Sequence, residues 1–205
     1  LAEAYSPLSL DVTLSDKTMP LAEALDYTHT NALLVMKDGK ILHEEYRNGS
    51  DAESRFISWS MAKSITSILF GIAMEEGHIK SLADTVDMYL PQYKGTVFEG
   101  VTLENMLLQK AGTSYKEFTL VGTAEVDILA EQGLFTGEKR FTDISTINLT
   151  RDSEQGTEFN YSTLTSSILG RVVEAATGQP LASYMEEKLW KPAGMQHSGF
   201  WMLDG

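Results

Sequence analysis

The segment from Phe56 to Gly77, FISWSMAKSITSILFGIAMEEG, constrains the fold of this chain more than any other. Its apolar residues recur at intervals of three and four, which predicts one amphipathic helix with Gly77 as a C-cap candidate. We expect the following residues to form the face that packs on the rest of the protein: Ile65, Ile68, Leu69, Ile72 and Ala73. A hydroxyl and an amine, Ser60 and Lys63, lie three residues apart where the apolar pattern begins.

This spacing suggests a chemical role for Ser60 and Lys63. Residues i and i+3 of a helix lie on one face about 5–6 Å apart, so the two side chains can meet. A serine becomes a nucleophile when a neighbouring base takes its proton, and unpaired N–H groups at a helix start stabilise developing negative charge. A lone S-x-x-K is nevertheless weak evidence, because Ser60 or Ser58 can also be a plain N-cap.

The flanking segments indicate strands before this helix and further helices after it. NALLVMKDGKILHEEYRNG reads as a hairpin around Asp38-Gly39, because Asp-Gly supplies the positive φ values of a tight turn. Its first strand, Ala32 to Met36, is almost entirely apolar, and we expect it to be buried in a sheet. From residue 77 to 153, short amphipathic pieces alternate with turns and predict a mostly helical region.

Two more helices follow near the end of the chain. They are STLTSSILGRVVEAATG, closed by Gly178, and PLASYMEEKLW, with Pro180 in its first turn. The predicted fold is therefore α/β (α+β), with residues 1–76 and 154–205 forming an α/β part and residues 77–153 an inserted helical part. Trp59 is expected in the core, and Trp190 is expected to pack on its helix.

Composition excludes several classes of protein. The net charge of −13, with only 16 Lys and Arg, argues against a nucleic-acid binder. A bilayer-spanning helix needs about 20 consecutive apolar residues, and none is predicted here. Zero cysteines and four scattered histidines give no metal-ligand spacing, so neither a metal nor a cofactor is expected. No leader is recognisable at the start, LAEAYS, and the sequence leaves the compartment and the oligomeric state open.

Longer matches add to this interpretation. The segment SMAKSITSILFGIAMEEGHIKSLADTVDMYLPQY resembles the first motif of the serine penicillin-recognising superfamily, which includes penicillin-binding DD-peptidases, β-lactamases and related esterases and amidases. VTLENMLLQKAG, residues 101–112, is similar to the segment that follows in that superfamily. GTEFNYSTLTSSILGRVVEAATGQPLASYMEEKLWKPAGM, residues 156–195, resembles its second motif region, and the Tyr-x-Asn element reads Tyr161-Ser162-Thr163.

The resemblance implies a role for each matching residue. Ser60 would be the nucleophile, Lys63 its base and Tyr161 the group that relays the proton to the leaving group. Thr163 would contact the substrate where many relatives have Asn, and this departure counts against a β-lactamase. Tyr115 would contact the substrate too, because Tyr115, Glu117 and Phe118 fall where relatives carry an acidic-aromatic loop, although packing of that loop explains them as well.

The superfamily's third motif is not found. His197-Ser198-Gly199 fits H-x-G literally, but it directly follows KPAGM, where relatives have a loop, and we interpret it as a coincidence. The C-terminal strands of the β-lactamase-like antiparallel sheet are apparently missing. We therefore expect the chain to be a fragment, or else to pair with another copy or segment. One oxyanion-hole donor, the N–H of the third-motif strand, would then be absent, and the N–H of Ser60 would be the other.

The sequence thus predicts a serine hydrolase that cleaves an ester or amide through a Ser60 acyl-enzyme. RDSEQGTEFNYS and EEKLWKPAGMQHSGFWMLDG look most like the branch of 6-aminohexanoate-dimer hydrolase and its carboxylesterase relatives. The expected partner is a small-molecule ester or amide. One alternative is a DD-peptidase or β-lactamase acting on D-Ala-D-Ala or β-lactam amides. Another is a penicillin-binding-like sensor or binding protein without turnover.

Overall fold

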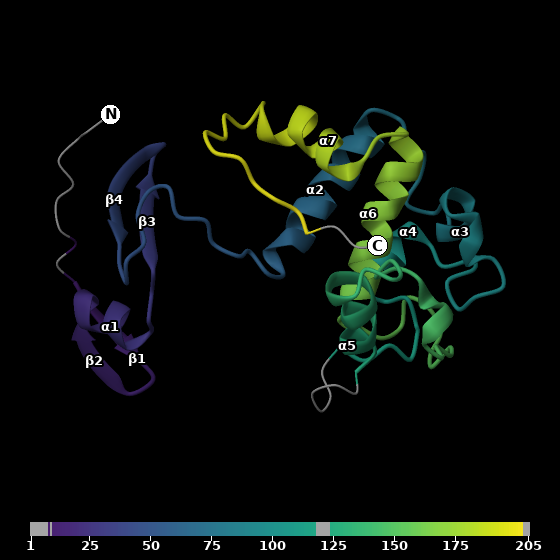
Figure 1. The fold of residues 1–205 in the computed structure, drawn as a ribbon, viewed down its shortest axis with the longest axis horizontal. Coiled ribbons are helices and arrows are strands. Elements are labelled where there is room, and N and C mark those ends of the chain that lie inside the picture. Colours follow the sequence, from purple (N-terminus) through teal and green to yellow (C-terminus); the bar gives the residue numbers. More distant parts are fainter. Residues whose placement is uncertain (1–7, 9, 118–123, 203–205) are drawn as a thin grey trace. The chain divides into compact units, whose positions relative to one another are not determined.

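The computed structural model describes residue 8 and residues 10–117 and 124–202. Its contacts divide the chain into two compact units, Leu1–Ile57 and Ser58–Gly205. Both are drawn in Figure 1. The predicted division into residues 1–76 with 154–205 and residues 77–153 cuts the chain at other points and stays a prediction.

The described residues of the first unit form two antiparallel hairpins and one helix. Strands β1 (Asp11–Leu14) and β2 (Lys17–Pro20) form the first hairpin, and α1 (Leu21–Tyr27) follows directly and contacts both strands. Strands β3 (Ala32–Lys37) and β4 (Lys40–Tyr46) form the second hairpin. The sequence predicted the second hairpin and missed the first, whose turn contains no glycine.

The turn between β3 and β4 confirms the role of Asp-Gly. Asp38 and Gly39 have φ values of 52° and 74°, the left-handed conformation of both central residues in a type I′ turn. The predicted burial of the first strand is wrong, since Leu34 and Met36 are 51% and 57% exposed. Among the described residues each sheet has only two strands, and one partner strand cannot cover both faces of β3.

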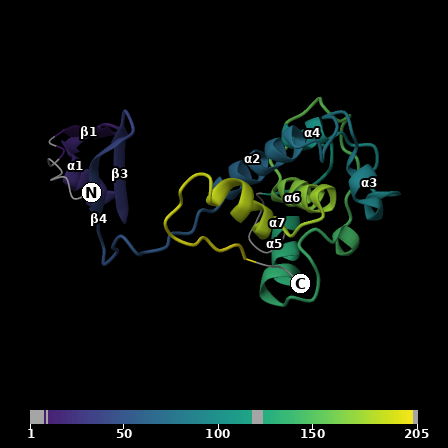
Figure 2. The same ribbon diagram turned by 90° about the horizontal axis from the view of Figure 1, so that it is seen from above.

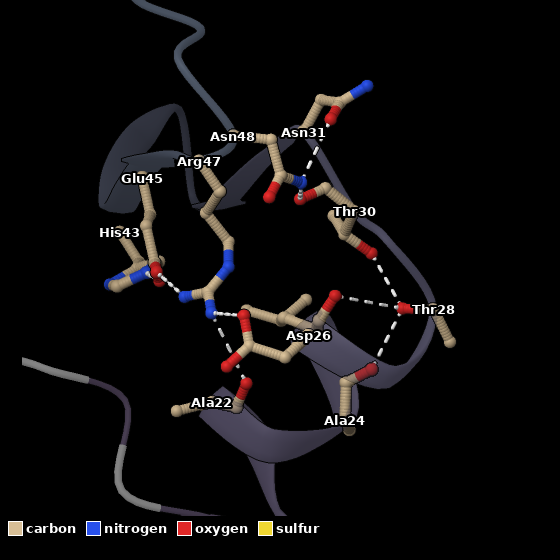
Figure 3. A network of polar contacts seen from close by, with 11 residues as sticks. Ala22, Ala24, Asp26, Thr28, Thr30, Asn31, His43, Glu45, Arg47 and Asn48 are labelled. Atoms are coloured by element: carbon tan, nitrogen blue, oxygen red, sulfur yellow. Dashed lines mark hydrogen bonds and ion pairs between the residues drawn. The ribbon is translucent and has the colours of Figure 1, made fainter.

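Arg47, which follows β4, connects this strand to α1 (Figure 3). Its guanidinium forms ion pairs with Glu45 and Asp26 and donates a 3.4 Å hydrogen bond to the Ala22 carbonyl. The His43 Nε2 lies 3.1 Å from the other oxygen of Glu45. The Arg47 hydrogen bond, and then that of His43, lower the pKa of Glu45.

The second unit consists of helices. They are α2 (Met61–Glu75), α3 (Val86–Tyr89), α4 (Leu103–Leu107), α5 (Glu125–Ala130), α6 (Thr163–Thr177) and α7 (Leu181–Met185), with short 3₁₀ or π turns η1 (Pro91–Tyr93), η2 (Glu131–Phe135), η3 (Ile144–Thr146) and η4 (Glu186–Trp190). Between residues 77 and 153, the described residues contain short helices, turns and isolated bridges, and the mostly helical part expected there stays a prediction. No described helix is both long and apolar enough to cross a membrane.

The core of this unit forms where α2 packs against α6 (Figure 1, Figure 2). The residues buried on these two helices are Thr66, Leu69, Phe70, Ala73, Leu164, Thr165, Ser166, Ile168, Leu169, Gly170, Val172 and Val173. Full burial of each large apolar side chain contributes about 1.5–3 kcal/mol. The face predicted for α2 is correct at Leu69 and Ala73 and wrong at Ile68, which is 45% exposed, because the helix is turned to bury Phe70.

The ends of the long helices agree with their sequence signals. Gly77 has a φ of 76°, its N–H donates to the Met74 carbonyl, and the His78 N–H donates to the Ala73 carbonyl, each at 2.9 Å. These two bonds form a Schellman motif, which requires a left-handed residue at Gly77. Gly178 closes α6 in the same conformation, with a φ of 69°, and Pro180 is the N-cap of α7, one residue earlier than predicted.

Glu76 connects the C-terminal end of α2 to the chain after α6. It accepts hydrogen bonds from the Tyr184 hydroxyl at 2.9 Å and from the Lys188 ammonium at 2.7 Å. These bonds, that of Lys188 first, lower the pKa of Glu76. Burial, and then the Glu76 carboxylate, raise the pKa of Tyr184 to about 12.

Candidate active site

Ser60 and Lys63 meet at the N-terminus of α2, as their spacing predicts. Ser60 is the N-cap residue, but its side chain caps no backbone N–H group. The Lys63 Nζ instead donates a 3.0 Å hydrogen bond to the Ser60 Oγ. A Ser60 Oγ that is exposed and bonded to an amine is arranged for proton transfer rather than for capping.

Trp59, directly before Ser60, is not in the core. It is 77% exposed, so the predicted burial is wrong. Its φ of 46° is left-handed, a conformation that costs a residue other than glycine about 1–2 kcal/mol. The sharp turn at Trp59 places Ser60 at the start of α2 and leaves the indole outside.

Tyr161 reaches the same place from the segment that precedes α6. The Lys63 Nζ lies 5.0 Å from the centroid of the Tyr161 ring, within cation–π range. Ser60 and Tyr161 are therefore both next to one amine, although about a hundred residues separate them in the chain.

Gln109, a residue that the sequence analysis did not single out, holds the segment around Tyr161. Its side-chain carbonyl accepts the Ser162 N–H at 2.7 Å, its amide donates to the Ser166 Oγ at 3.0 Å, and its backbone carbonyl accepts the Asn160 N–H at 2.8 Å. The Ser162 Oγ then caps α6 by accepting the Thr165 N–H at 3.0 Å. Both neighbours of Tyr161 are thus fixed by hydrogen bonds to one residue.

Asn160 connects this segment to the loop that contains Thr113 and Tyr115. Its Nδ2 donates to the carbonyls of Thr113 at 3.1 Å and Tyr115 at 2.9 Å. The loop approaches residues 151–156 so closely at Gly112 (φ 74°) that a Cβ there would lie 2.4 Å from the Ser153 carbonyl oxygen. The glycine in QKAGT and the asparagine in FNYS are the sequence signals that could have predicted this support.

Thr163 is the first residue of α6, directly after the N-cap Ser162, and it contacts Glu117. The Thr163 N–H donates to the Glu117 Oε2 at 2.8 Å, and the Thr163 hydroxyl donates to the Glu117 Oε1. Glu117 therefore holds the first residue of α6 with both oxygens, where negative charge also suits the helix dipole.

Tyr115 is buried rather than exposed. Its ring is fully buried, and its hydroxyl makes no hydrogen bond of ordinary geometry with the described residues. Burial, and next the Glu117 carboxylate, raise the pKa of Tyr115. Its predicted contact with substrate stays a prediction, and Phe118, the third residue predicted on this loop, lies outside the described residues.

The remaining candidates stay outside this group. His197-Ser198-Gly199 lies in no strand, consistent with a coincidental match to H-x-G. Trp190, which belongs to η4, donates its indole N–H to the His197 carbonyl at 2.8 Å. Within the described ranges, no three His, Asp or Glu side chains gather in a way that could hold a metal ion.

Comparison with known proteins gives a family match over most of the chain. The family model described as beta-lactamase matches residues 22–203. The 6-aminohexanoate-dimer hydrolase of Paenarthrobacter ureafaciens is 26% identical over 180 residues, which cover 86% of this chain and 46% of that protein. The chain thus spans less than half the length of this curated relative.

Solved structures give the fold. D-alanine carboxypeptidase AmpC from Burkholderia cenocepacia superimposes with a TM-score of 0.63 at 25% identity, covering 86% of this chain and 47% of that one. EstCE1, a hydrolase with promiscuous acyltransferase activity, superimposes with a TM-score of 0.67 at 20% identity, covering 88% and 51%. The predicted β-lactamase-like fold class is confirmed.

Proposed function

Because the chain belongs to the beta-lactamase family, we propose that it is the nucleophile-bearing part of a serine hydrolase that cleaves an ester or amide through a Ser60 acyl-enzyme. The observation that carries the proposal is the 3.0 Å hydrogen bond between the Lys63 Nζ and the Ser60 Oγ, with the Tyr161 ring on the amine. The names of two similar proteins, a 6-aminohexanoate-dimer hydrolase and a hydrolase with promiscuous acyltransferase activity, support it.

The first half-reaction makes the acyl-enzyme. Lys63, as the neutral amine, accepts the Ser60 proton while the oxygen attacks the substrate carbonyl. The negative charge that develops on the carbonyl oxygen faces the start of α2, where the Ser60 N–H forms no hydrogen bond with the described residues and can donate. Lys63 then passes its proton through Tyr161 to the leaving alkoxide or amine.

The second half-reaction releases the acid. Water loses a proton to the same Lys63 and Tyr161 pair and attacks the acyl carbonyl, and the proton returns to the Ser60 oxygen as the bond breaks. Both half-reactions require the amine within hydrogen-bond reach of the Ser60 Oγ. The hydrogen bonds that fix Asn160 and Ser162 hold Tyr161 beside it and provide the preorganisation that such transfers require.

Covalent labelling tests the assignment. The full-length protein is treated with a fluorophosphonate, and the adduct is located by peptide mass spectrometry. We expect one adduct, on Ser60. Ser60→Ala should abolish it, and Ser67→Ala, at an exposed serine further along α2, should leave it unchanged. An adduct on another residue, or labelling of Ser60→Ala equal to the wild type, would overturn the proposal.

A second candidate is a DD-peptidase or β-lactamase, favoured by the structural likeness to a D-alanine carboxypeptidase. We rank it lower because Thr163, in the position of the usual asparagine, already donates its hydroxyl proton to Glu117. Rates on a chromogenic cephalosporin that exceed those on short-chain aryl esters would reverse this order. A binding protein without turnover would either leave Ser60 unlabelled or form an adduct with β-lactams that is never released.

A further inference from the structure

Glu117 changes what Thr163 can offer to a ligand. A threonine hydroxyl has one proton to donate and lone pairs that accept. In this structure that proton goes to the Glu117 Oε1, while the Glu117 Oε2 accepts the Thr163 N–H at 2.8 Å. Both carboxylate oxygens of Glu117 thus accept hydrogen bonds from Thr163. The Thr163 Oγ can therefore accept a hydrogen bond from a ligand but has no proton left to donate.

Neighbouring contacts hold the segment that carries Glu117. Tyr115, two residues before Glu117, is fully buried, and burial, followed by the Glu117 carboxylate, raises its pKa. The loop is fixed from the other side by the two hydrogen bonds of Asn160. Glu117 is thus held at the first residue of α6, beside Thr163.

We infer that Glu117 is a specificity-determining positioning residue, which makes the start of α6 a subsite for the N–H donor of an acyl group and not for a carbonyl acceptor. This inference rests on the proposed function, because it requires that Thr163, two residues after Tyr161, faces the acyl group. An asparagine in this position would still offer a donor after satisfying Glu117, because its amide carries two N–H groups. The pair of Thr163 and Glu117 instead selects a ligand group that donates a hydrogen bond to the Thr163 Oγ.

The test uses full-length protein and p-nitrophenyl esters whose acyl chains match except at one carbon, which is a methylene, a ketone or a protonated amine. The main readout is the ratio of kcat/KM for the ketone ester to that for the plain alkyl ester. Both esters are neutral, so the charge of Glu117 has no direct effect on this ratio. In the wild type the ketone should bring no advantage, and the amine ester should be preferred.

Glu117→Gln keeps the shape of the side chain and replaces a carboxylate oxygen, which accepts hydrogen bonds, by an amide nitrogen, which donates them. The glutamine amide can donate to the Thr163 Oγ, which frees the hydroxyl proton for a ketone. We expect the ketone-to-alkyl ratio to rise about tenfold, the effect of one hydrogen bond. Glu117→Gln combined with Thr163→Val should show no rise, because the valine has no hydroxyl. Thr163→Asn, with Glu117 intact, should raise the ratio by a similar factor and gives a second, independent variant.

The outcomes separate this inference from the proposed function. If Ser60 is labelled and alkyl esters are hydrolysed, but neither Glu117→Gln nor Thr163→Asn raises the ratio, only the inference is overturned. An equal rise with and without the Thr163 hydroxyl also overturns it, because the effect would then not pass through Thr163. Absence of labelling at Ser60 in the wild type overturns both.

Discussion

Replacing Asn160 by aspartate exchanges the amide nitrogen that donates two hydrogen bonds beside Tyr161 for a carboxylate oxygen, which donates none. The Asn160 Nδ2 lies 3.1 Å from the Thr113 carbonyl oxygen and 2.9 Å from that of Tyr115. Asn160→Ala removes both hydrogen bonds and should lower the free energy of unfolding by about 1–3 kcal/mol, at 0.5–1.5 kcal/mol for each. Asn160→Asp removes the same bonds and also points a carboxylate at two carbonyl oxygens, so we expect about 3–5 kcal/mol at pH 7.

The pH dependence identifies the cause. Below about pH 4 the introduced carboxyl is protonated and can donate one hydrogen bond. The penalty of Asn160→Asp should therefore shrink with falling pH to that of Asn160→Ala or less, while the penalty of the alanine variant stays nearly constant. Asn148→Asp, at an exposed position of the same unit, makes the same chemical change and should stay within about 0.5 kcal/mol of the wild type.

Urea unfolding followed by tryptophan fluorescence measures these differences. All three tryptophans of the chain, Trp59, Trp190 and Trp201, lie in the unit from Ser58 to Gly205. The reasoning would be refuted if Asn160→Asp were as stable as the wild type at pH 7, or more stable than Asn160→Ala.

Two further predictions concern the stability of the same unit. Glu76→Gln removes a carboxylate whose pKa is lowered in the folded state by Lys188 and Tyr184, so the contribution of this carboxylate to stability is present at neutral pH and lost as the pH falls through the folded pKa. The denaturant midpoints of the variant and the wild type should therefore differ at pH 7 and converge below about pH 4. An equal difference at both pH values would contradict this. Gly112→Ala places a Cβ 2.4 Å from the Ser153 carbonyl oxygen and should lower the free energy of unfolding, measured with heat or urea, by about 3 kcal/mol or more. Gly100→Ala, with a φ of 72° and no atom within 4 Å of the added Cβ, should lower it by about 1 kcal/mol. Equal losses would show that the close approach at Gly112 does not matter.

Local features were predictable because their causes lie within a few residues. The contact between Ser60 and Lys63 follows from helix geometry, and the turn of the second hairpin follows from Asp38 and Gly39. The burial of Phe70 in place of Ile68 depends on where α6 lies, and no pattern within α2 contains that information. The exposure of Trp59 depends in the same way on the turn that its positive φ makes.

The contacts that surround Tyr161 link residues far apart in the sequence. Glu117 and Thr163 are 46 residues apart, and Gln109 and Ser162 are 53 apart. Motif spacing could place Tyr161 and Thr163 in the candidate site, but which polar group each backbone amide binds is decided by packing of the 109–117 segment against α6. The sequence therefore predicted the residues proposed for the chemistry and named Glu117 as part of a loop near the substrate, but it missed Gln109 and Asn160, which hold the Tyr161 segment.

Gln109 also links the hydrogen exchange of two backbone amides beside Tyr161. The amides of Asn160 and Ser162, on either side of Tyr161, both donate to Gln109. A backbone amide exchanges its hydrogen with solvent only when its bond opens, so these two amides should exchange together, whenever this segment separates from the end of α4. Their hydrogen–deuterium exchange rates thus report how often the segment that carries Tyr161 opens.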